Sequence, residues 1–467
     1  MRHAVLVSGL CVLAAFPPVL AVLGTSAPRP APHEAAALSD RRAPAAAQRV
    51  VEYHGLRVAV PAGWEVHDLD RDPSRCVRYD RHAVYLGRPG PRPDCPARLV
   101  GRTEAVHIQP AERARPAGHG RAARTVVHGD QLAALTIPPT VDHEARLAVP
   151  EAGVTITGVY GTDPAGLQRM LRDTRLNANR PARPRTPVPP MPSGPPMPSA
   201  PSIPSGPAIP SGPAMPEMPS KQDVKHDTPR RPQQDAPALD RPWARGKGFD
   251  TCTAPSLAAM RAWRPSFKIT NIYIGGAARG CAQPNLTERW VREVREMGYR
   301  ITPTYVGLQA PCGSRPQRFT PKNAASQGAK AAVDAARKAR ALGIPEGAPI
   351  YYDMEAYKRK NASCRAAVLR FVDNWVRRLK DVGYEPCLYS SVTSGIRDVG
   401  RADGISRPVS IWFANWDGRA KVYGDPFIPD DWWRPHRRIK QYRGGHKEKH
   451  GGVTLNIDSN IVDGRVY

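Results

Sequence analysis

The sequence predicts an α/β protein whose residues 243–467 form a (β/α)8 barrel of the TIM type. Three observations predict this fold. Amphipathic segments ending at Gly298, Gly343 and Gly383 each lead into an apolar strand, which is typical of parallel β/α units. Eight strands fit into about 225 residues, the usual size of such a barrel. A doubly wound open sheet is the alternative, but no glycine-rich phosphate loop follows the first strand.

The elements of this region follow one another in a regular order. Asn285 followed by Glu288 resembles a capping box, and residues 286–297 then keep one apolar helical face. Residues 322–342 and 364–382 are predicted to form two further helices, each followed by a strand. The predicted strands end near Asp250, Gly275, Gly307, Glu355, Ser391, Trp416, Tyr442 and Asp458.

The N-terminal segment, residues 1–27, contains Arg2, an apolar run and then a stretch of small residues that could form a cleavage site. These features indicate a secretory signal peptide. A membrane anchor is the alternative. Because Pro17 and Pro18 interrupt the run, no stable membrane span is expected after cleavage. Residues 28–48 are rich in Ala and Pro and are predicted to be disordered. We therefore expect a secreted, extracellular protein associated with the cell wall.

A small β-rich domain of unknown role is predicted for residues 49–179. Apolar and polar residues alternate weakly over residues 50–60, and a Pro-Ala-Gly-Trp stretch follows. This pattern indicates a hairpin. Residues 155–160 read as a further strand, and residues 163–176 read as a closing helix. No catalytic constellation is recognisable in this domain.

Residues 180–242 are predicted to be a Pro-rich disordered linker. The hexapeptide Ile-Pro-Ser-Gly-Pro-Ala occurs at residues 203–208 and again at residues 209–214. Proline at this frequency favours extended polyproline II, which spans about 3.1 Å per residue and cannot bury a core. The linker therefore provides reach, for instance through a porous wall.

The net charge of +26 predicts a preference for polyanions. After export, the available polyanions are cell-wall glycans or other anionic wall polymers. Nucleic acid is therefore not expected as a partner. From residue 243 onward, 38 Lys and Arg residues stand against 20 Asp and Glu residues, so the predicted barrel is itself basic.

Seven of the eight cysteines follow the signal peptide, and none forms a CxxC pair, so neither zinc nor another cofactor is expected. An oxidising compartment favours disulfides instead. Cys76 and Cys95 bracket a strand and a Pro/Gly loop. A bridge between them would close a loop of about 20 residues and stabilise the fold by roughly 3 kcal/mol.

The stretch from Pro349 to Tyr357 contains the chemistry that most strongly suggests a function. Side chains two apart in a strand point to the same side, so Asp353 and Glu355 should lean together at a strand end, beside Tyr351. Two neighbouring acids repel, and their pKa values should separate. Such a pair can cleave a glycosidic bond. The alternative is a strand end that carries two solvated acids.

The C-terminal ends of the predicted strands carry acids and aromatic residues, which would therefore lie on one rim of the barrel. Carboxylates can transfer protons, and aromatic faces can support sugar rings. The proposed catalytic set is Asp250, Asp353, Glu355 and Asp458, and the proposed substrate-binding set is Tyr305, Tyr351, Tyr357, Trp412, Asn415, Trp416, Gln441 and Tyr442. Two simpler readings stay open: Asp250 could be a helix N-cap, and Asp458 could pair with Arg443.

Six motifs resemble the secreted actinobacterial domain described as glycoside-hydrolase-like, formerly a domain of unknown function. They are Gly248-Phe249-Asp250-Thr251-Cys252, Tyr273-Ile274-Gly275-Gly276, Pro303-Thr304-Tyr305-Val306-Gly307, Tyr351-Tyr352-Asp353-Met354-Glu355, Trp412-Phe413-Ala414-Asn415-Trp416 and Gln441-Tyr442-Arg443-Gly444-Gly445-His446. That family is similar in turn to the family 25 glycoside hydrolases, lysozymes that cut peptidoglycan on a (β/α)8 barrel. The resemblance spans residues 247–467.

The resemblance implies a role for each acid. Glu355 would be the general acid, and Asp353 would orient an N-acetyl group or stabilise an oxocarbenium-like charge. Asp250 and Asp458 would tune and position these groups. It also implies disulfides between Cys252 and Cys281 and between Cys312 and Cys364, which leaves Cys387 buried and free.

Two functions follow as hypotheses. The first is an exported glycosidase, similar to a lysozyme or muramidase, that acts on peptidoglycan or a related amino-sugar polymer. The second is a catalytically inactive protein that binds cell-wall glycan on a hydrolase scaffold. The resemblance favours the first, and the basic charge and long linker are compatible with either.

Overall fold

The computed structural model describes residues 47–111, 123–124, 127–128, 131–132, 139–177 and 241–467. The predicted signal peptide lies outside the described residues. So do all but the last two residues of the predicted disordered segment and all but the last two of the predicted linker. No helix in the described ranges is both long and apolar enough to cross a membrane.

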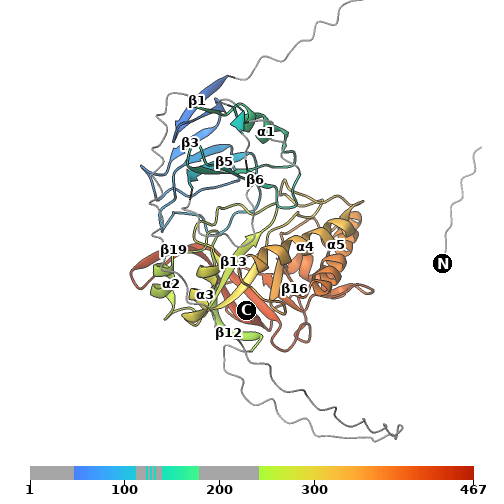
Figure 1. The fold of residues 1–467 in the computed structure, drawn as a ribbon. Helices are drawn as coiled ribbons and strands as arrows, with labels where there is room; N and C mark the ends of the chain where they lie inside the picture. Colours follow the sequence, from blue (N-terminus) through green and yellow to red (C-terminus); the bar gives the residue numbers. More distant parts are fainter. Residues whose placement is uncertain (1–46, 112–122, 125–126, 129–130, 133–138, 178–240) are drawn as a thin grey trace, which may run out of the picture. The chain divides into compact units, whose positions relative to one another are not determined.

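The described residues between 48 and 176 form two β-sheets with one helix (Figure 1). The predicted hairpin is confirmed, because β1 and β2 are antiparallel neighbours. Gln48 lies opposite Pro61 at one end of the pair, and Tyr53 lies opposite Leu56 at the other. The strand orders are β1-β2-β11-β8-β7 and β3-β4-β5-β10-β9-β6. The elements are β1 (Gln48–Tyr53), β2 (Leu56–Pro61), β3 (Glu65–Asp68), β4 (Ala83–Leu86), β5 (Ala105–Pro110), β6 (Ala123–Arg124), β7 (Val127–His128), β8 (Gln131–Leu132), β9 (Glu144–Val149), β10 (Val154–Val159), α1 (Ala165–Arg172) and β11 (Arg175–Leu176).

Residues 243–465 form a closed barrel of eight strands in sequence order, β12 to β19. The strands are β12 (Trp243–Asp250), β13 (Ile269–Gly275), β14 (Arg300–Tyr305), β15 (Pro349–Met354), β16 (Glu385–Ser391), β17 (Ser410–Ala414), β18 (Arg438–His450) and β19 (Val453–Arg465). The helices are α2 (Leu257–Trp263), α3 (Glu288–Glu296), α4 (Ala324–Arg340), α5 (Ala362–Asp381), the π-helix η1 (Val392–Ile396) and α6 (Arg397–Arg401).

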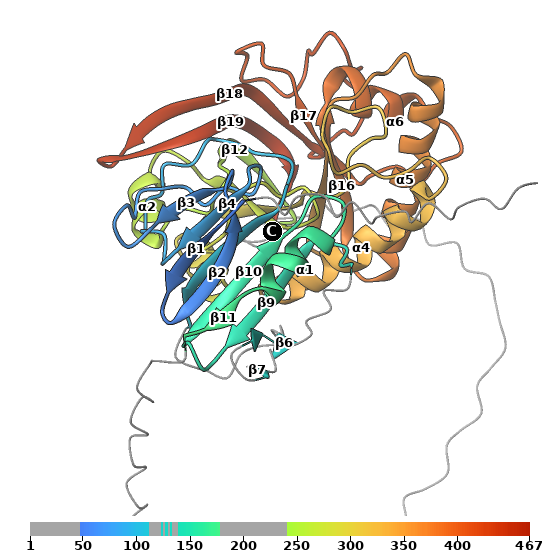
Figure 2. The same ribbon diagram turned by 90° about the horizontal axis from the view of Figure 1, so that it is seen from above.

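The prediction of a (β/α)8 barrel is wrong, because helices and strands do not alternate through the whole barrel. No helix separates β17 from β18 or β18 from β19. Neighbouring strands from β12 to β18 pair parallel, but β19 runs antiparallel to both β18 and β12 (Figure 2). The described C-terminal region is a closed eight-stranded barrel with few helices.

The final two strands differ from the prediction because of one turn. Gly451 and Gly452, both with positive φ, connect β18 to β19. A two-residue connection can join only antiparallel strands, whereas parallel strands need a crossover of a dozen or more residues. The predicted strand that ends near Tyr442 therefore continues to His450. Asp458, expected at the end of a parallel strand, lies inside β19 opposite Asp250.

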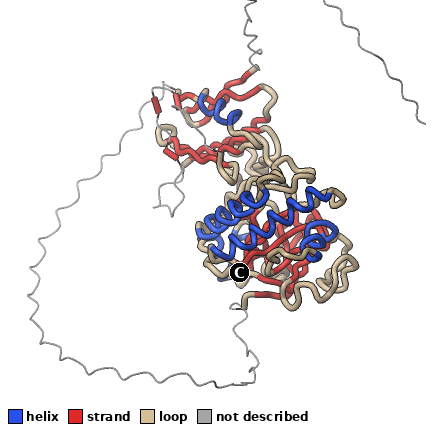
Figure 3. Tube along the Cα trace, turned by 90° about the vertical axis from the view of Figure 1, so that its right-hand side faces the viewer, coloured by secondary structure: helices blue, strands red, loops and turns tan. Residues whose placement is uncertain are grey.

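The helices pack against the outside of the barrel strands (Figure 3). Trp290 on α3 and Trp375 on α5 are buried in this layer, as their helical spacing predicts. The N-cap of α3 is Thr287, whose side chain accepts a hydrogen bond from the backbone of Trp290, and not the predicted Asn285. Because η1 and α6 are short, the outer layer is incomplete after β16.

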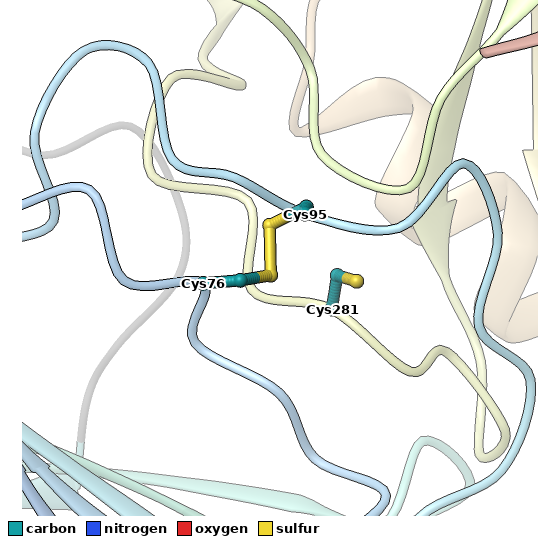
Figure 4. Close-up of side chains that lie close together, drawn as sticks. All are labelled: Cys76, Cys95 and Cys281. Atoms are coloured by element: carbon teal, nitrogen blue, oxygen red, sulfur yellow. A yellow bond between two sulfur atoms is a disulfide. The ribbon is translucent and has the colours of Figure 1, made fainter. Parts of the chain in front are cut away.

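Three disulfides join the cysteine pairs expected from the sequence: Cys76–Cys95, Cys252–Cys281 and Cys312–Cys364. Cys387 is the free cysteine of the described ranges and is buried. The Sγ atoms of Cys76, Cys95 and Cys281 lie within 4.8 Å of one another (Figure 4). Since all three belong to disulfides, they offer no thiolate to a metal. No other such cluster of metal-binding groups occurs among the described residues.

Candidate active site

Four carboxyl groups from three strands meet at one mouth of the barrel. Asp250 ends β12, Asp353 lies in β15, Glu355 directly follows β15, and Asp458 lies in β19. Their exposed fractions are 0%, 1%, 9% and 2%, respectively. Burying so many acids is costly unless they are protonated, paired or hydrogen-bonded. Their contacts therefore determine what the site can do.

Gln441 in β18 links two of these acids. Its Nε2 donates to Asp250 at 3.2 Å and to Asp458 at 3.1 Å. Its Oε1 accepts hydrogen bonds from the hydroxyl of Tyr389 at 3.1 Å and from Nε1 of Trp416 at 2.9 Å. This buried amide therefore fixes the spacing of the acids and connects them to the rim.

Asp250 and Asp458 form a close pair across β12 and β19. Asp250 accepts hydrogen bonds from Asn460 at 2.6 Å and from the hydroxyl of Tyr273 at 3.1 Å. Burial raises the pKa of Asp250. Burial, together with the negative charge of Asp250, raises the pKa of Asp458 to about 8. The pair therefore keeps a proton at neutral pH. Ser256, and not Asp250, is the N-cap of α2.

Asp353 is a deeply buried carboxyl beside Glu355. Burial and then the neighbouring Glu355 raise the pKa of Asp353 well above its ordinary value. Its Oδ1 is buried, and within the described part of the chain it has no hydrogen-bond partner. An unpartnered buried acceptor is rare in folded proteins, and Oδ1 of Asp353 therefore keeps its capacity to accept a hydrogen bond.

Glu355 is held from two sides. Its backbone N–H donates to Oε1 of Gln309 at 2.7 Å, while Nε2 of Gln309 donates to the carbonyl of Asp353 at 2.7 Å. Gln309 thereby fixes the backbone that carries both acids. The carboxylate of Glu355 pairs with Arg98 through Oε1 and with Arg315 through Oε2 at 3.4 Å.

Tyr351 and Trp412 lie inside the barrel and not at its rim. The hydroxyl of Tyr351 donates to the carbonyl of Arg465 and hydrogen-bonds the hydroxyl of Ser410, so it faces away from the acids. Nε1 of Trp412 donates to Oδ1 of Asn460 at 2.8 Å. Since Asn460 donates to Asp250, Trp412 positions this acid indirectly. The interiors of eight-stranded barrels are normally filled by such side chains.

Two of the predicted aromatic residues face the helices. The hydroxyl of Tyr305 donates to Asp334 on α4 at 2.8 Å, and the hydroxyl of Tyr357 donates to Asp398 on α6 at 2.7 Å. Both rings pack in the core between strands and helices. They do not join the acids at the barrel mouth. Tyr305 faces outward because the preceding Thr304 faces the barrel interior.

Trp416 is the aromatic residue best placed for a ligand. Its side chain is 61% exposed, and its Nε1–H is held by Gln441 at the centre of the site. Asn415 donates to Asp425 at 2.8 Å, which shapes the adjacent loop. Tyr442 is half-buried on β18. Trp416 thus gives the acid cluster a large exposed ring at its edge.

Sequence reasoning missed five residues that contact the acids: Tyr273, Asn460, Arg98, Arg315 and Gln309. It also missed Tyr389, which bonds Arg98 and Gln441. The inward alternation of β16 could have indicated Tyr389, which lies opposite Asp353 in the parallel register. Tyr273 lies in a motif already noted. No local signal could have indicated Arg98, because it is 257 residues from Glu355 in the chain.

Residues 261–462 match the family described as the Rv2525c-like, glycoside hydrolase-like domain, which confirms the resemblance for this part of the chain. No curated protein matches the chain.

Three solved structures show similarity to the chain. An uncharacterised B. stearothermophilus protein is 20% identical over 47% of this chain and 99% of its own, with a TM-score of 0.33. The Clostridium perfringens spore cortex lytic enzyme SleM is 16% identical over 43% of this chain and 62% of its own, with a TM-score of 0.31. The modular autolysin LytC from Streptococcus pneumoniae is 11% identical over 46% of each chain, with a TM-score of 0.31. This chain therefore spans less than two thirds of the length of SleM and LytC.

Proposed function

We propose that the protein is an exported glycoside hydrolase that acts on peptidoglycan or a related amino-sugar polymer of the cell wall. The observation that carries this proposal is the convergence of Asp250, Asp353, Glu355 and Asp458 at one barrel mouth. The family match and the three disulfides, which are typical of exported proteins, support it.

In the proposed mechanism, Glu355 is the general acid because, at 9% exposed, it is the most accessible of the four acids. Glu355 gives its proton to the glycosidic oxygen as the bond to the anomeric carbon breaks. The carbonyl oxygen of the sugar's own N-acetyl group forms a bond to that carbon. Water then displaces the acetamido oxygen and returns a proton to Glu355, so the configuration is retained.

Asp353 orients the N-acetyl group in this proposal. A neutral carboxyl can donate one hydrogen bond and accept others, whereas it cannot balance a full positive charge. The raised pKa of Asp353 therefore favours the orienting role over stabilisation of an oxocarbenium-like charge. Asp250 and Asp458, held by Gln441, position the floor of the site. The exposed ring of Trp416 provides a sugar platform.

The test is the release of reducing ends from purified peptidoglycan by the full chain. Glu355→Gln should lower the initial rate at least a hundredfold, because general acid catalysis contributes about 10²–10⁴-fold. Glu346→Gln, at an exposed glutamate remote from the mouth, is the matched control and should leave the rate unchanged. If Glu355→Gln releases reducing ends as fast as the wild type, the catalytic assignment is wrong.

A second candidate function is glycan binding without turnover. The pairing of both oxygens of Glu355 with Arg98 and Arg315 favours it, since a carboxylate held in this way is not free to donate a proton. This function predicts that the protein co-sediments with cell wall at low salt, that added salt weakens the interaction, and that Glu355→Gln binds like the wild type. Salt-insensitive sedimentation would contradict it.

A further inference from the structure

A short segment between β4 and β5, residues 97–102, lies at the barrel mouth. We call it the Arg98 segment. The Arg98 guanidinium hydrogen-bonds Glu355 and the hydroxyl of Tyr389, and it lies 3.4 Å from Oε1 of Gln441. Its side chain is 14% exposed, and its Cζ atom lies 5.0 Å from the centroid of the Tyr389 ring. The catalytic mouth is thus filled by a residue from the N-terminal sheets.

Backbone hydrogen bonds hold the Arg98 segment against the loop that follows β13. Gly101 N–H donates to the carbonyl of Ala278 at 2.7 Å, and Gly280 N–H donates to the carbonyl of Leu99 at 3.3 Å. A Cβ atom at Gly280 would lie 2.5 Å from Cβ of Leu99, so this approach requires glycine. Val100 packs beside Tyr273, a residue that also bonds Asp250.

The loop that follows β14 holds the other side of the segment. Oε1 of Gln317 accepts from the backbone N–H of Arg102 at 2.8 Å, and Nε2 of Gln317 donates to the carbonyl of Arg102 at 2.6 Å. Upstream, the disulfide between Cys76 and Cys95 restrains the chain three residues before Arg98. The guanidinium is therefore presented by a segment that is fixed on both sides.

A buried ionic network fastens the same region. Glu144 of β9 pairs with Arg102 at 3.3 Å and with Arg279 of the barrel at 3.1 Å. Although burial opposes ionisation, the neighbouring Arg146, Arg279 and Arg102 hold the pKa of Glu144 well below its ordinary value. Lys338 of α4 pairs with Asp142. These contacts are polar, so separating them exposes charges that water can solvate.

The contacts conflict with a substrate-positioning role for Arg98. A guanidinium has donors only, so the Arg98 guanidinium takes up acceptor capacity on the Glu355 oxygen that would otherwise face a leaving group. Arg315 takes the other oxygen of Glu355. A glycosidic oxygen would have to occupy the position that the Arg98 guanidinium fills.

We infer that the Arg98 segment is a built-in inhibitor that blocks the barrel mouth until the N-terminal sheets move away. This inference rests on the proposed function, because it regulates the same site. In the docked state, the protein would be exported in a latent form. Withdrawal of Arg98 would free the carboxyl of Glu355, open the space over Tyr389 and leave Trp416 as the edge of an accessible groove.

The test compares the wild-type full chain with Arg98→Ala in two assays. One is the release of reducing ends from purified peptidoglycan. The other is the binding of an N-acetylglucosamine tetramer, followed by tryptophan fluorescence. Arg98→Ala should increase the initial rate and the affinity at least tenfold. Arg71→Ala, at an 88% exposed arginine that pairs with Asp68, is the matched control and should behave as wild type.

A second variant keeps the test decisive if thermal unfolding shows that Arg98→Ala is not stably folded. Gln317→Ala removes both hydrogen bonds to the backbone of Arg102 and leaves the acids untouched, and it should increase binding and rate in the same direction. Equal tetramer affinity and equal rate for the wild type and both variants would overturn the inference.

The two assays separate this inference from the proposed function. A gain of tetramer binding by Arg98→Ala without any release of reducing ends would support the inhibitor and contradict the hydrolase. Strong release by the wild type that Arg98→Ala does not change would support the hydrolase and contradict the inhibitor.

Discussion

Replacing Asp458 by Asn should change how stability depends on pH. In the folded chain, burial and then Asp250 raise the pKa of Asp458 to about 8. The pKa of an unfolded aspartate is about 3.9. The folded state therefore retains a proton that the unfolded state loses. The stabilisation is fully present below about pH 4 and is lost as the pH rises through about 8.

The magnitude follows from these two pKa values. Between pH 5 and pH 8 the wild type should lose about 4 kcal/mol of stability through this carboxyl, at about 1.4 kcal/mol for each pH step. Asn cannot titrate, so Asp458→Asn does not lose this contribution as the pH rises. The free energy of unfolding of Asp458→Asn, relative to the wild type, should therefore increase with pH across this window.

The assay is urea unfolding of both proteins at pH 5, 6, 7 and 8. Asp403→Asn, at an exposed aspartate, is the control and should follow the wild type at every pH. If the difference between Asp458→Asn and the wild type stays constant from pH 5 to pH 8, Asp458 does not hold a proton in the folded protein. That result would refute the description of the acid pair.

Three further predictions follow from single contacts. Glu144→Gln should cost about 3–5 kcal/mol in urea unfolding, because it leaves two buried guanidinium groups without a charge partner, whereas Glu346→Gln should cost under 0.5 kcal/mol. Trp416→Ala in an Arg98→Ala background should weaken tetramer binding about tenfold in isothermal titration calorimetry, and unchanged affinity would remove the ring from the site. Replacing both Cys312 and Cys364 by Ala should lower the free energy of unfolding by about 4 kcal/mol, since the disulfide closes a long loop. An unchanged urea midpoint would contradict the last estimate.

The parts of the site that depend on strand periodicity were predictable. The two-residue spacing of Asp353 and Glu355 predicted that they share a side, and both reach the mouth from the end of β15. The amphipathic spacing around Trp290 and Trp375 likewise predicted their burial. In these cases the residues that decide the outcome are close together in the sequence.

The parts that depend on distant segments were not predictable. A strand pattern does not show direction, so the strand ending near Asp458 was expected to be parallel to its neighbours, whereas the turn at Gly451 and Gly452 makes β19 antiparallel to β18. Whether Tyr305 faces the barrel interior or the surrounding helices depends on whether its neighbour Thr304 faces the interior. Arg98 acts through a contact between segments that the sequence keeps far apart, and no local pattern indicates it.

The most direct test of the proposed glycan site is a crystal structure of the full chain with Arg98→Ala and Glu355→Gln, soaked with the N-acetylglucosamine tetramer. The first substitution opens the mouth, and the second prevents turnover. We predict a sugar ring against Trp416, with its N-acetyl group within hydrogen-bond distance of Oδ1 of Asp353. A tetramer bound elsewhere, with Oδ1 of Asp353 still unpartnered, would contradict a glycan site at the barrel mouth.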